Sequence, residues 1–365
     1  YILESPFEKG VIYTGSDDGL LHITKDNGAH WQNITPPGLP VCLINAIEIS
    51  PFDKATAYIA TTRYKFNDYA PALYKTTDYG KTWTKISNGI PYGAHTRVIR
   101  EDEVRKDLLY AGTELGVYVS WNGGKDWSPF QLNLPIVPIT DLRVHQGNLI
   151  AATAGRSYWI LDDLSLIRQY KKDNEAFKVF KPAPAVLMNG YSELDESKND
   201  FTGMGTFNGV NPATGVVVYY SLPEIKDSTL QLTMEIKDAA GHIVRSFTSK
   251  EDGGGKKYNG APSPEPRLSM AKGLNRFVWD MRHPSLPGVP EVYMAVSYNG
   301  HKAAPGKYTL SLKLGDKIVA TEAEIEANPL YRTTSADYKE YDADRKSTRL
   351  NSSHTDILVC RLLLE

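Results

Sequence analysis

Thr24-Lys25-Asp26-Asn27-Gly28-Ala29-His30-Trp31 is the first of three copies of one pattern, Ser/Thr-x-Asp-x-Gly-x-x-Trp. The second copy spans residues 76–83, and the third, residues 120–127, has Asn122 in place of Asp. We call these stretches box one, box two and box three. A pattern that returns after about 45 to 50 residues, between β-rich segments, is typical of the blades of a β-propeller.

The residue types of the box predict a fastened turn followed by a buried ring. The Asp or Asn side chain accepts hydrogen bonds from backbone N–H groups a few residues further on. The Gly supplies a positive φ, and the Trp is expected to start the next strand and to bury its ring between neighbouring sheets. The predicted structural residues are Asp26, Gly28, Trp31, Asp78, Gly80, Trp83, Asn122, Gly124 and Trp127.

Catalytic carboxylates or calcium ligands are the alternative interpretation of Asp26 and Asp78. A group repeated in every blade is more often a device of the fold, and Ca²⁺ needs several oxygens that converge in one loop. The eight His residues show no i, i+4 pair and no neighbouring ligand set suited to zinc. The chain also has no Gly-rich phosphate loop between a strand and a helix. We therefore predict no metal site and no cofactor.

Composition bounds the class of protein. The 365 residues suggest two domains, and the 22 Tyr, 29 Gly and 22 Pro favour β-structure. The 41 basic and 43 acidic residues are interspersed, unlike the basic stripe of a nucleic-acid binder, so no nucleic-acid partner is expected. No apolar run is long enough for a transmembrane span.

Four blade-like units and a second domain are predicted. The fold class is therefore all-β: a partial propeller of about four blades, expected to be truncated at its N-terminus, followed by an Ig-like β-sandwich. Strict alternation of apolar and polar residues around 230–237 and 308–314 indicates antiparallel sheet with one buried face. The recurring blade strands are 11–15, 57–61, 109–113 and 149–153, and a boxless unit, 155–163, closes the set. The predicted domains are 1–170 (propeller), 171–215 (linker and loop), 216–330 (sandwich), 331–343 (start of a helix) and 344–365 (tail).

The tail, residues 344–365, resembles a translated sequencing-library adapter. It is therefore given no part in the functional argument. Cys360 lies within it, which leaves Cys42 as the one native thiol and no disulfide to form.

Several motifs together carry a family resemblance. The first half of the chain resembles the bacterial BNR/Asp-box repeat proteins, which are related to the sortilin propeller and often labelled glycosyl hydrolases. The resemblance lies in the three boxes, in residues 110–114 and in the closing unit 155–163. Residues 273–282 and 304–308 resemble the Ig-like or fibronectin type III-like domain that follows the propeller in these proteins. The resemblance implies an extracellular or periplasmic protein and does not imply a particular reaction.

Recognition of a peptide or a glycan is the predicted function, because loops at one end of a propeller converge. Catalytic residues stay unknown. Aromatic residues around Tyr64, Phe66, Tyr69 and Tyr74 are read as blade packing, with stacking on sugar rings as the alternative. The candidate ligand face consists of His95, Arg97, Glu114, Asp141 and Arg156.

Two enzymatic alternatives stay open. A glycoside hydrolase of xyloglucanase type would use two facing carboxylates, mostly from an N-terminal part that we expect to lie outside this chain. A sialidase would need three arginines around a substrate carboxylate. The arginines available in different blades are Arg63, Arg97, Arg143 and Arg156.

Overall fold

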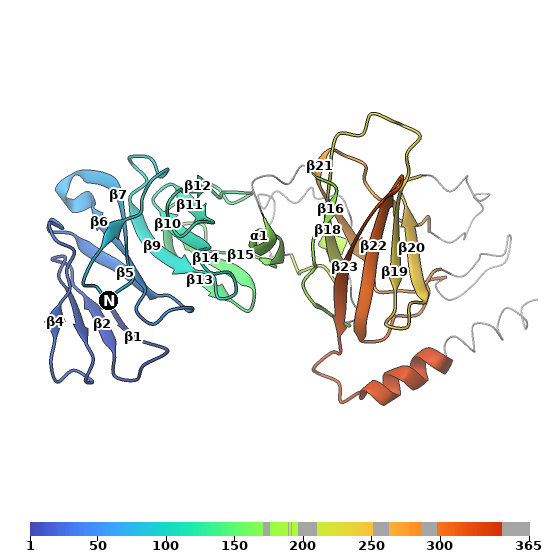
Figure 1. Cartoon of the computed structure of the whole chain (residues 1–365), viewed down its shortest axis with the longest axis horizontal. Helices are drawn as coiled ribbons and strands as arrows, with labels where there is room; N and C mark the ends of the chain where they lie inside the picture. The colour runs from blue at the N-terminus through green and yellow to red at the C-terminus, as the bar shows by residue number, and fades with distance from the viewer. Residues whose placement is uncertain are drawn as a thin grey trace, which may run out of the picture. The chain divides into compact units, whose positions relative to one another are not determined.

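The structure is a computed structural model, and it describes residues 1–170, 176–188, 190, 192–195, 210–250, 263–285 and 298–344. The chain divides into two compact units. The described residues of the first unit are Tyr1–Leu164, and those of the second begin at Ser165. The predicted fold class is confirmed, because the chain is built almost entirely from antiparallel sheets of propeller type and sandwich type (Figure 1).

The first unit consists of four small sheets in chain order. In each sheet, strands that follow one another in sequence are neighbours and run antiparallel. The first sheet is β1 (Ile2–Glu4), β2 (Ile12–Gly15), β3 (Leu21–Thr24) and β4 (Gln32–Asn33). The second is β5 (Leu43–Ile49), β6 (Ala57–Arg63), β7 (Asp68–Thr76) and β8 (Thr84–Lys85), with the 3₁₀ turn η1 (Tyr64–Phe66) between β6 and β7. The third is β9 (Thr96–Glu101), β10 (Leu109–Thr113), β11 (Gly116–Ser120) and β12 (Ser128–Pro129), and the fourth is β13 (Ile139–His145), β14 (Asn148–Thr153) and β15 (Tyr158–Leu161).

The apolar-then-small strands of the sequence pattern are the second strand of each sheet. Their small residues lie where the next sheet begins. A Cβ on Gly15 would stand 2.4 Å from the side chain of Ile44, and one on Gly112 would stand 2.7 Å from that of Ile139. The crowding that the pattern indicated is therefore contact with the first strand of the following sheet.

Each box closes its own turn with the same hydrogen bonds. In box two, the Thr76 hydroxyl donates to Asp78 Oδ1 at 2.8 Å and accepts from the N–H of Gly80 at 2.9 Å. Asp78 Oδ1 also accepts from the N–H of Thr82 at 2.9 Å, and Thr24 and Asp26 repeat the arrangement in box one. The hydrogen bonds from Thr82 lower the pKa of Asp78 to about 2. These carboxylates therefore point into their own turns and share no pocket.

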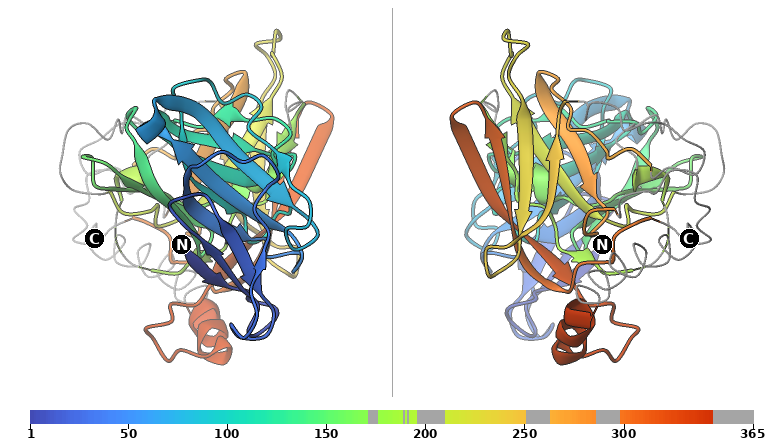
Figure 2. Two further views of the ribbon diagram at one scale, coloured as in Figure 1. Left: turned by 90° about the vertical axis from the view of Figure 1, so that its left-hand side faces the viewer. Right: turned by 90° about the vertical axis from the view of Figure 1, so that its right-hand side faces the viewer.

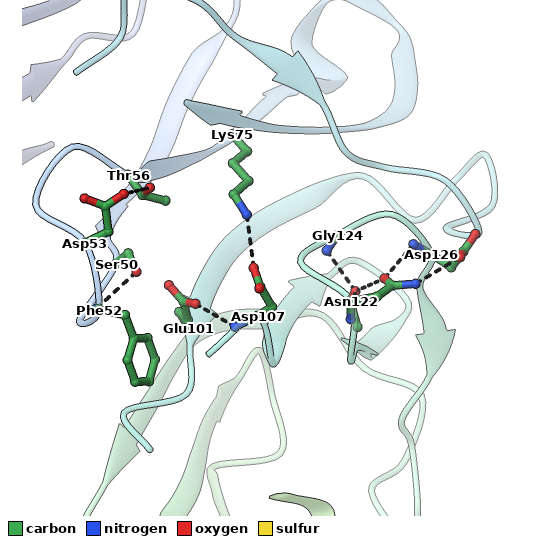
Figure 3. A network of polar contacts seen from close by, with 11 residues as sticks. Ser50, Phe52, Asp53, Thr56, Lys75, Glu101, Asp107, Asn122, Gly124 and Asp126 are labelled. Atoms are coloured by element: carbon green, nitrogen blue, oxygen red, sulfur yellow. Dashed lines mark hydrogen bonds and ion pairs between the residues drawn. The ribbon is translucent and has the colours of Figure 1, made fainter. Parts of the chain in front are cut away.

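Box three exchanges donor and acceptor. Asn122 Oδ1 takes the place of the carboxylate oxygen by accepting from Ser120 and from the N–H of Asp126. Its Nδ2 then donates to Asp126 Oδ2 at 3.0 Å (Figure 3). In box two the same pair of positions has Thr82 donating to Asp78 Oδ2 at 2.6 Å. The third and seventh positions of the box therefore always hold one acceptor and one donor.

Boxes two and three also join their sheets to the sheet before. The indole N–H of Trp83 donates to the carbonyl oxygen of Ile34 at 2.7 Å, and that of Trp127 donates to the carbonyl oxygen of Ile86. The box glycines approach the same isoleucines, since a Cβ on Gly80 would lie 2.7 Å from the Ile34 side chain. We call this pairing of a Trp and a Gly with the preceding Ile the Ile clamp.

The expectation that every box Trp is buried is wrong for Trp31. Trp127 is 4% exposed, Trp83 is partly buried, and Trp31 is 45% exposed. Trp31 belongs to the first sheet, and no earlier sheet of this chain offers it a carbonyl oxygen. A Cβ on Gly28 likewise meets only the Trp31 ring, at 3.9 Å.

Polar contacts add to the joints between sheets at the box end. Lys75 Nζ on β7 lies 3.1 Å from Asp107 Oδ1, just before β10 (Figure 3). Asp107 also donates its N–H to Glu101 Oε1 and accepts from the N–H of Gly123. The second and third sheets are therefore tied through one aspartate as well as through the clamp.

The second unit contains two sheets that face each other. One is β16 (Lys178–Val179), β18 (Val216–Leu222) and β21 (Gly273–Trp279). The other is β17 (Ala185–Val186), β23 (Lys317–Glu326), β22 (Gly306–Leu314), β19 (Leu232–Lys237) and β20 (Ile243–Thr248). The right view of Figure 2 shows the red-orange strands β22 and β23 and the yellow strands β19 and β20 of this sheet. Helix α1 (Ser165–Gln169), the 3₁₀ turn η2 (Glu193–Asp195) and a helix over residues 335–344 complete the unit.

The core of this β-sandwich comes from both sheets. Val218, Phe277 and Trp279 of one sheet share a buried cluster with Met234 and Leu310 of the other. The alternating pattern of the sequence therefore places its apolar residues inward. Residues 315–316 form the turn of the β22–β23 hairpin, in which Leu314 pairs with Lys317. The Ig-like topology stays a prediction.

Replacement of the box glycines by alanine should separate the turn from the clamp. All three glycines have a positive φ, so each Gly→Ala change costs about 1 kcal/mol in backbone strain. Gly80→Ala and Gly124→Ala should cost about 2 to 3 kcal/mol, because their Cβ atoms also enter Ile34 and Ile86. Chemical denaturation measures the difference, with Gly28→Ala as the matched control. Equal losses at all three positions would contradict the clamp.

Box three offers a test by repair. Asn122→Asp should destabilise the first unit by about 1 kcal/mol, because it removes the donor and sets a second carboxylate against Asp126. Adding Asp126→Thr recreates the pair found in box two and should restore most of the loss. Thermal unfolding of the single and double variants measures this coupling. A double variant no more stable than the single one would show that the two positions act independently.

Candidate functional site

Several residues of the predicted ligand face lie together at one end of the second and third sheets, opposite the boxes. The antiparallel pairing of Thr96 with Thr113 brings the start of β9 beside the end of β10. His95 and Glu114, the next residues on each side, are then neighbours, and the N–H of Glu114 donates to the His95 carbonyl oxygen at 3.0 Å. Residues that are far apart in sequence are thus adjacent for reasons of strand register alone.

Thr96 fixes this end of the two sheets. Its hydroxyl donates toward the carbonyl oxygens of Thr61 and Ala72 and accepts from the N–H of Ala72, at 3.0 to 3.1 Å. Its own carbonyl oxygen accepts from Nδ2 of Asn45 at 3.1 Å. Because Thr96 is fully buried, these bonds hold β6, β7 and β9 in one arrangement.

His95 lies buried under aromatic rings. Its ring is stacked on Tyr64 with centroids 5.6 Å apart and lies 6.1 Å from the ring of Tyr69. Neither ring nitrogen has a hydrogen-bond partner among the described residues, although Nε2 lies 3.3 Å from Glu114 Oε2. Burial lowers the pKa of His95 and Arg97 acts in the same direction, against the opposing effect of Glu114. Both nitrogens are shielded from solvent, so the imidazole supports the tyrosine rings and is not itself exposed to a ligand.

Arg97 and Glu114 form a two-point ion pair beside His95. Arg97 Nε and Nη2 donate to Glu114 Oε2 at 2.9 and 2.6 Å. Both side chains are about one-third exposed. The pair thus presents fixed polar groups to solvent and keeps its geometry through two charge-assisted hydrogen bonds.

Exposed tyrosines surround these polar groups. Tyr64 and Tyr69 are 39% and 38% exposed, and Tyr92, which meets Tyr69 edge-on at 6.3 Å, is 68% exposed. The N–H of Gly93 donates to the carbonyl oxygen of Tyr69, which ties the loop of Tyr92 to β7. We call Tyr64, Tyr69, Tyr92, His95, Arg97 and Glu114 the His95 face.

The sequence pointed to part of this face. Tyr92 was missed because it stands alone in a loop, where no pattern distinguishes it from any surface tyrosine. Tyr74 packs against the core of the first two sheets, as read from the sequence. The guanidinium carbon of Arg63 lies 5.6 Å from the centroid of the Phe66 ring.

Asp141 and Arg156 lie apart from the His95 face. Asp141 Oδ1 lies 2.9 Å from Nη2 of Arg100. The same guanidinium donates from Nε to the carbonyl oxygen of Leu142, and its Nη1 lies 3.4 Å from Glu48 Oε2. Arg156 lies in the turn between β14 and β15, where its backbone bonds Thr153 and Trp159. In the described part of the chain, neither side chain forms an ion pair or hydrogen bond with His95, Arg97 or Glu114.

Two of the four arginines considered for a sialidase are paired with carboxylates, which leaves fewer than the three that a sialidase needs. Arg63 lies 2.7 Å from Asp68 Oδ2, and Arg97 is paired with Glu114. Each guanidinium is thus already neutralised, which leaves little charge for a substrate carboxylate. A convergent arginine cluster is therefore not supported by the described residues.

Glu48 is the most strongly perturbed carboxyl of the first unit. It lies on β5 beside Arg100 of β9, which contacts Asp141 of β13, so this Arg100 network crosses the first strands of three sheets. Burial raises the pKa of Glu48 to about 7, although Arg100 opposes the shift. No sequence pattern marks Glu48, because its shift comes from desolvation in the assembled sheets.

No family model matches the chain, and no curated protein matches it. No helix in the part of the chain that the structure describes is long and apolar enough to cross a membrane.

Solved structures give low-identity likenesses. YCF48 bound to a D1 peptide is 17% identical, with 44% of this chain and 54% of that chain covered and a TM-score of 0.34. A GH74 enzyme of Niastella koreensis is 15% identical, with 60% and 32% covered and a TM-score of 0.36. The GH74 xyloglucanase of Xanthomonas campestris is 13% identical, with 88% and 55% covered and a TM-score of 0.37. This chain thus spans between about a third and about half of the length of these three proteins. Any functional proposal must therefore be argued from the side chains of this protein.

The shifted pKa of Glu48 predicts a pH dependence of stability. A carboxyl whose pKa is higher in the folded state than its ordinary value of 4.5 stabilises the fold fully below that value, and this contribution is lost as pH rises toward 7. Glu48→Gln should therefore gain stability relative to the unchanged chain between pH 5 and pH 8, by about 3 kcal/mol at most. Urea denaturation at both pH values measures this gain. A difference that is the same at both pH values would contradict the buried, protonated state.

Proposed function

We propose that the His95 face is a binding surface for a glycan chain. Its main support is the combination of three exposed tyrosine rings with the Arg97–Glu114 ion pair, whose side chains are about one-third exposed and held by two hydrogen bonds. Sugar rings present apolar C–H faces and a rim of hydroxyl groups. Aromatic faces beside fixed donors and acceptors suit both parts of such a ligand.

Binding without turnover is the form of this proposal that the geometry favours. Glycoside hydrolysis needs two carboxylates on either side of one glycosidic bond. Glu114 is held by Arg97, whereas Asp141 belongs to the Arg100 network. An extracellular or periplasmic location, proposed from the family resemblance, would give the face access to polysaccharide.

The test is titration of the full chain with xyloglucan and cellulose-derived oligosaccharides by calorimetry. Tyr92→Ala should weaken binding about five-fold, because one exposed stacking contact is worth about 1 kcal/mol. Glu114→Gln should weaken it as well, since Arg97 then loses its charged partner and its fixed position. Tyr158→Ala is the matched control: Tyr158 is 75% exposed and lies on β15, outside the face.

The outcomes separate the alternatives. Loss in Tyr92→Ala but not in Tyr158→Ala supports the proposal. Binding of peptides instead of sugars, with the same dependence on Tyr92, would assign the face to a peptide ligand. Release of reducing ends, abolished by Glu114→Gln or Asp141→Asn, would favour the hydrolase alternative. No binding to any glycan would refute the glycan proposal.

A further inference from the structure

A cluster of two histidines and one aspartate lies in the second unit, far in sequence from every box. An antiparallel bridge between Arg282 and Lys302 joins the segment after β21 to the segment before β22. It is made by two hydrogen bonds, from the His283 N–H to the His301 carbonyl oxygen and from the Ala303 N–H to the Met281 carbonyl oxygen. This register sets His283 directly beside His301. Their rings are stacked, with centroids 4.0 Å apart and planes 15° apart.

The helix over residues 335–344 supplies the third group. Thr334 caps its first turn by accepting from the N–H of Asp337, while Asp337 Oδ2 accepts from the Thr334 N–H. Two turns later, Asp342 Oδ1 lies 3.3 Å from His301 Nε2 and 3.6 Å from His283 Nε2. Asp342 precedes the tail that resembles an adapter.

We infer that His283, His301 and Asp342 form a binding site for Zn²⁺. Two imidazole nitrogens and a carboxylate oxygen are ligands that zinc takes, and the three ligand atoms lie within 4.8 Å of one another. Ligands about 2.0 to 2.1 Å from a tetrahedral zinc ion are about 3.3 Å apart, close to both His–Asp distances. His301 Nε2 and Asp342 Oδ1 are also within hydrogen-bond distance, so the same two atoms can pair directly.

The surroundings of the cluster support a bound cation. The side chains of His283 and His301 are only 11% and 9% exposed, and that of Asp342 is 23% exposed. Burial of ligands on three separate segments pre-forms the site, which lowers the entropic cost of binding. A guanidinium N–H of Arg245 donates to the His283 carbonyl oxygen and so fixes the backbone of that ligand.

The nearby cationic side chains are directed to other acceptors. Arg245 is paired with Glu265, Arg282 donates to the carbonyl oxygen of Gly300, and Lys302 donates to the carbonyl oxygen of Asp280. The carboxylate of Asp342 lies beside both imidazoles, with its Oδ1 toward the two Nε2 atoms. A zinc ion would clamp the helix to the β-sandwich, and three protein ligands leave one position for water.

The experiment uses the metal alone. The full chain is stripped with a chelator and titrated with Zn²⁺ against a chromophoric competitor, and with Co²⁺, whose visible absorption reports tetrahedral ligands. We expect one ion per chain and a higher melting temperature with Zn²⁺. His301→Gln and Asp342→Asn should each weaken Zn²⁺ binding about 100-fold, with unchanged far-ultraviolet circular dichroism.

Two controls guard against binding elsewhere. His242 Nδ1 lies 3.3 Å from Asp238 Oδ2, so this exposed pair matches one half of the cluster without a second histidine. His242→Gln should leave Zn²⁺ affinity unchanged, and so should joint replacement of His354 and Cys360 in the tail. Absence of stoichiometric Zn²⁺ binding, or binding that survives in His301→Gln and Asp342→Asn, would overturn the inference.

Discussion

The Ile clamp is the constraint on which the first unit depends. A small sheet of three or four strands cannot bury its faces alone, so each sheet must pack on its neighbour. Trp83 and Gly80 act together on Ile34, one through a hydrogen bond and one by leaving room for the side chain. The same residues therefore close a turn and set the spacing of two sheets, which explains why they recur as a unit.

The His95 face depends on that packing at the opposite end of the strands. Its tyrosines on η1 and β7 come from the second sheet, whereas His95, Arg97 and Glu114 come from the third. Thr96 joins the two halves through buried hydrogen bonds. A ligand would therefore meet a surface already assembled, because moving one half relative to the other would break bonds that no water can replace.

The repeating parts of the fold could be predicted from the sequence, but little of the two proposed sites could. Periodic boxes and alternating strands were readable because their signal lies in local spacing, as at Asp78 and Leu310. Arg97 and Glu114 could be listed but not paired, since their contact follows from the register of β9 and β10. The group of His283, His301 and Asp342 escaped the search for zinc ligands, which looked for short spacings, whereas three distant segments bring these ligands together.

The exchange of donor and acceptor in box three has a consequence for how such repeats evolve and are recognised. A change of Asn122 to Asp alone sets two carboxylates against each other, so the two positions are expected to change as a couple. A search profile that scores every column separately undervalues such a repeat. One that scores the two columns jointly would recover degenerate blades that present patterns overlook.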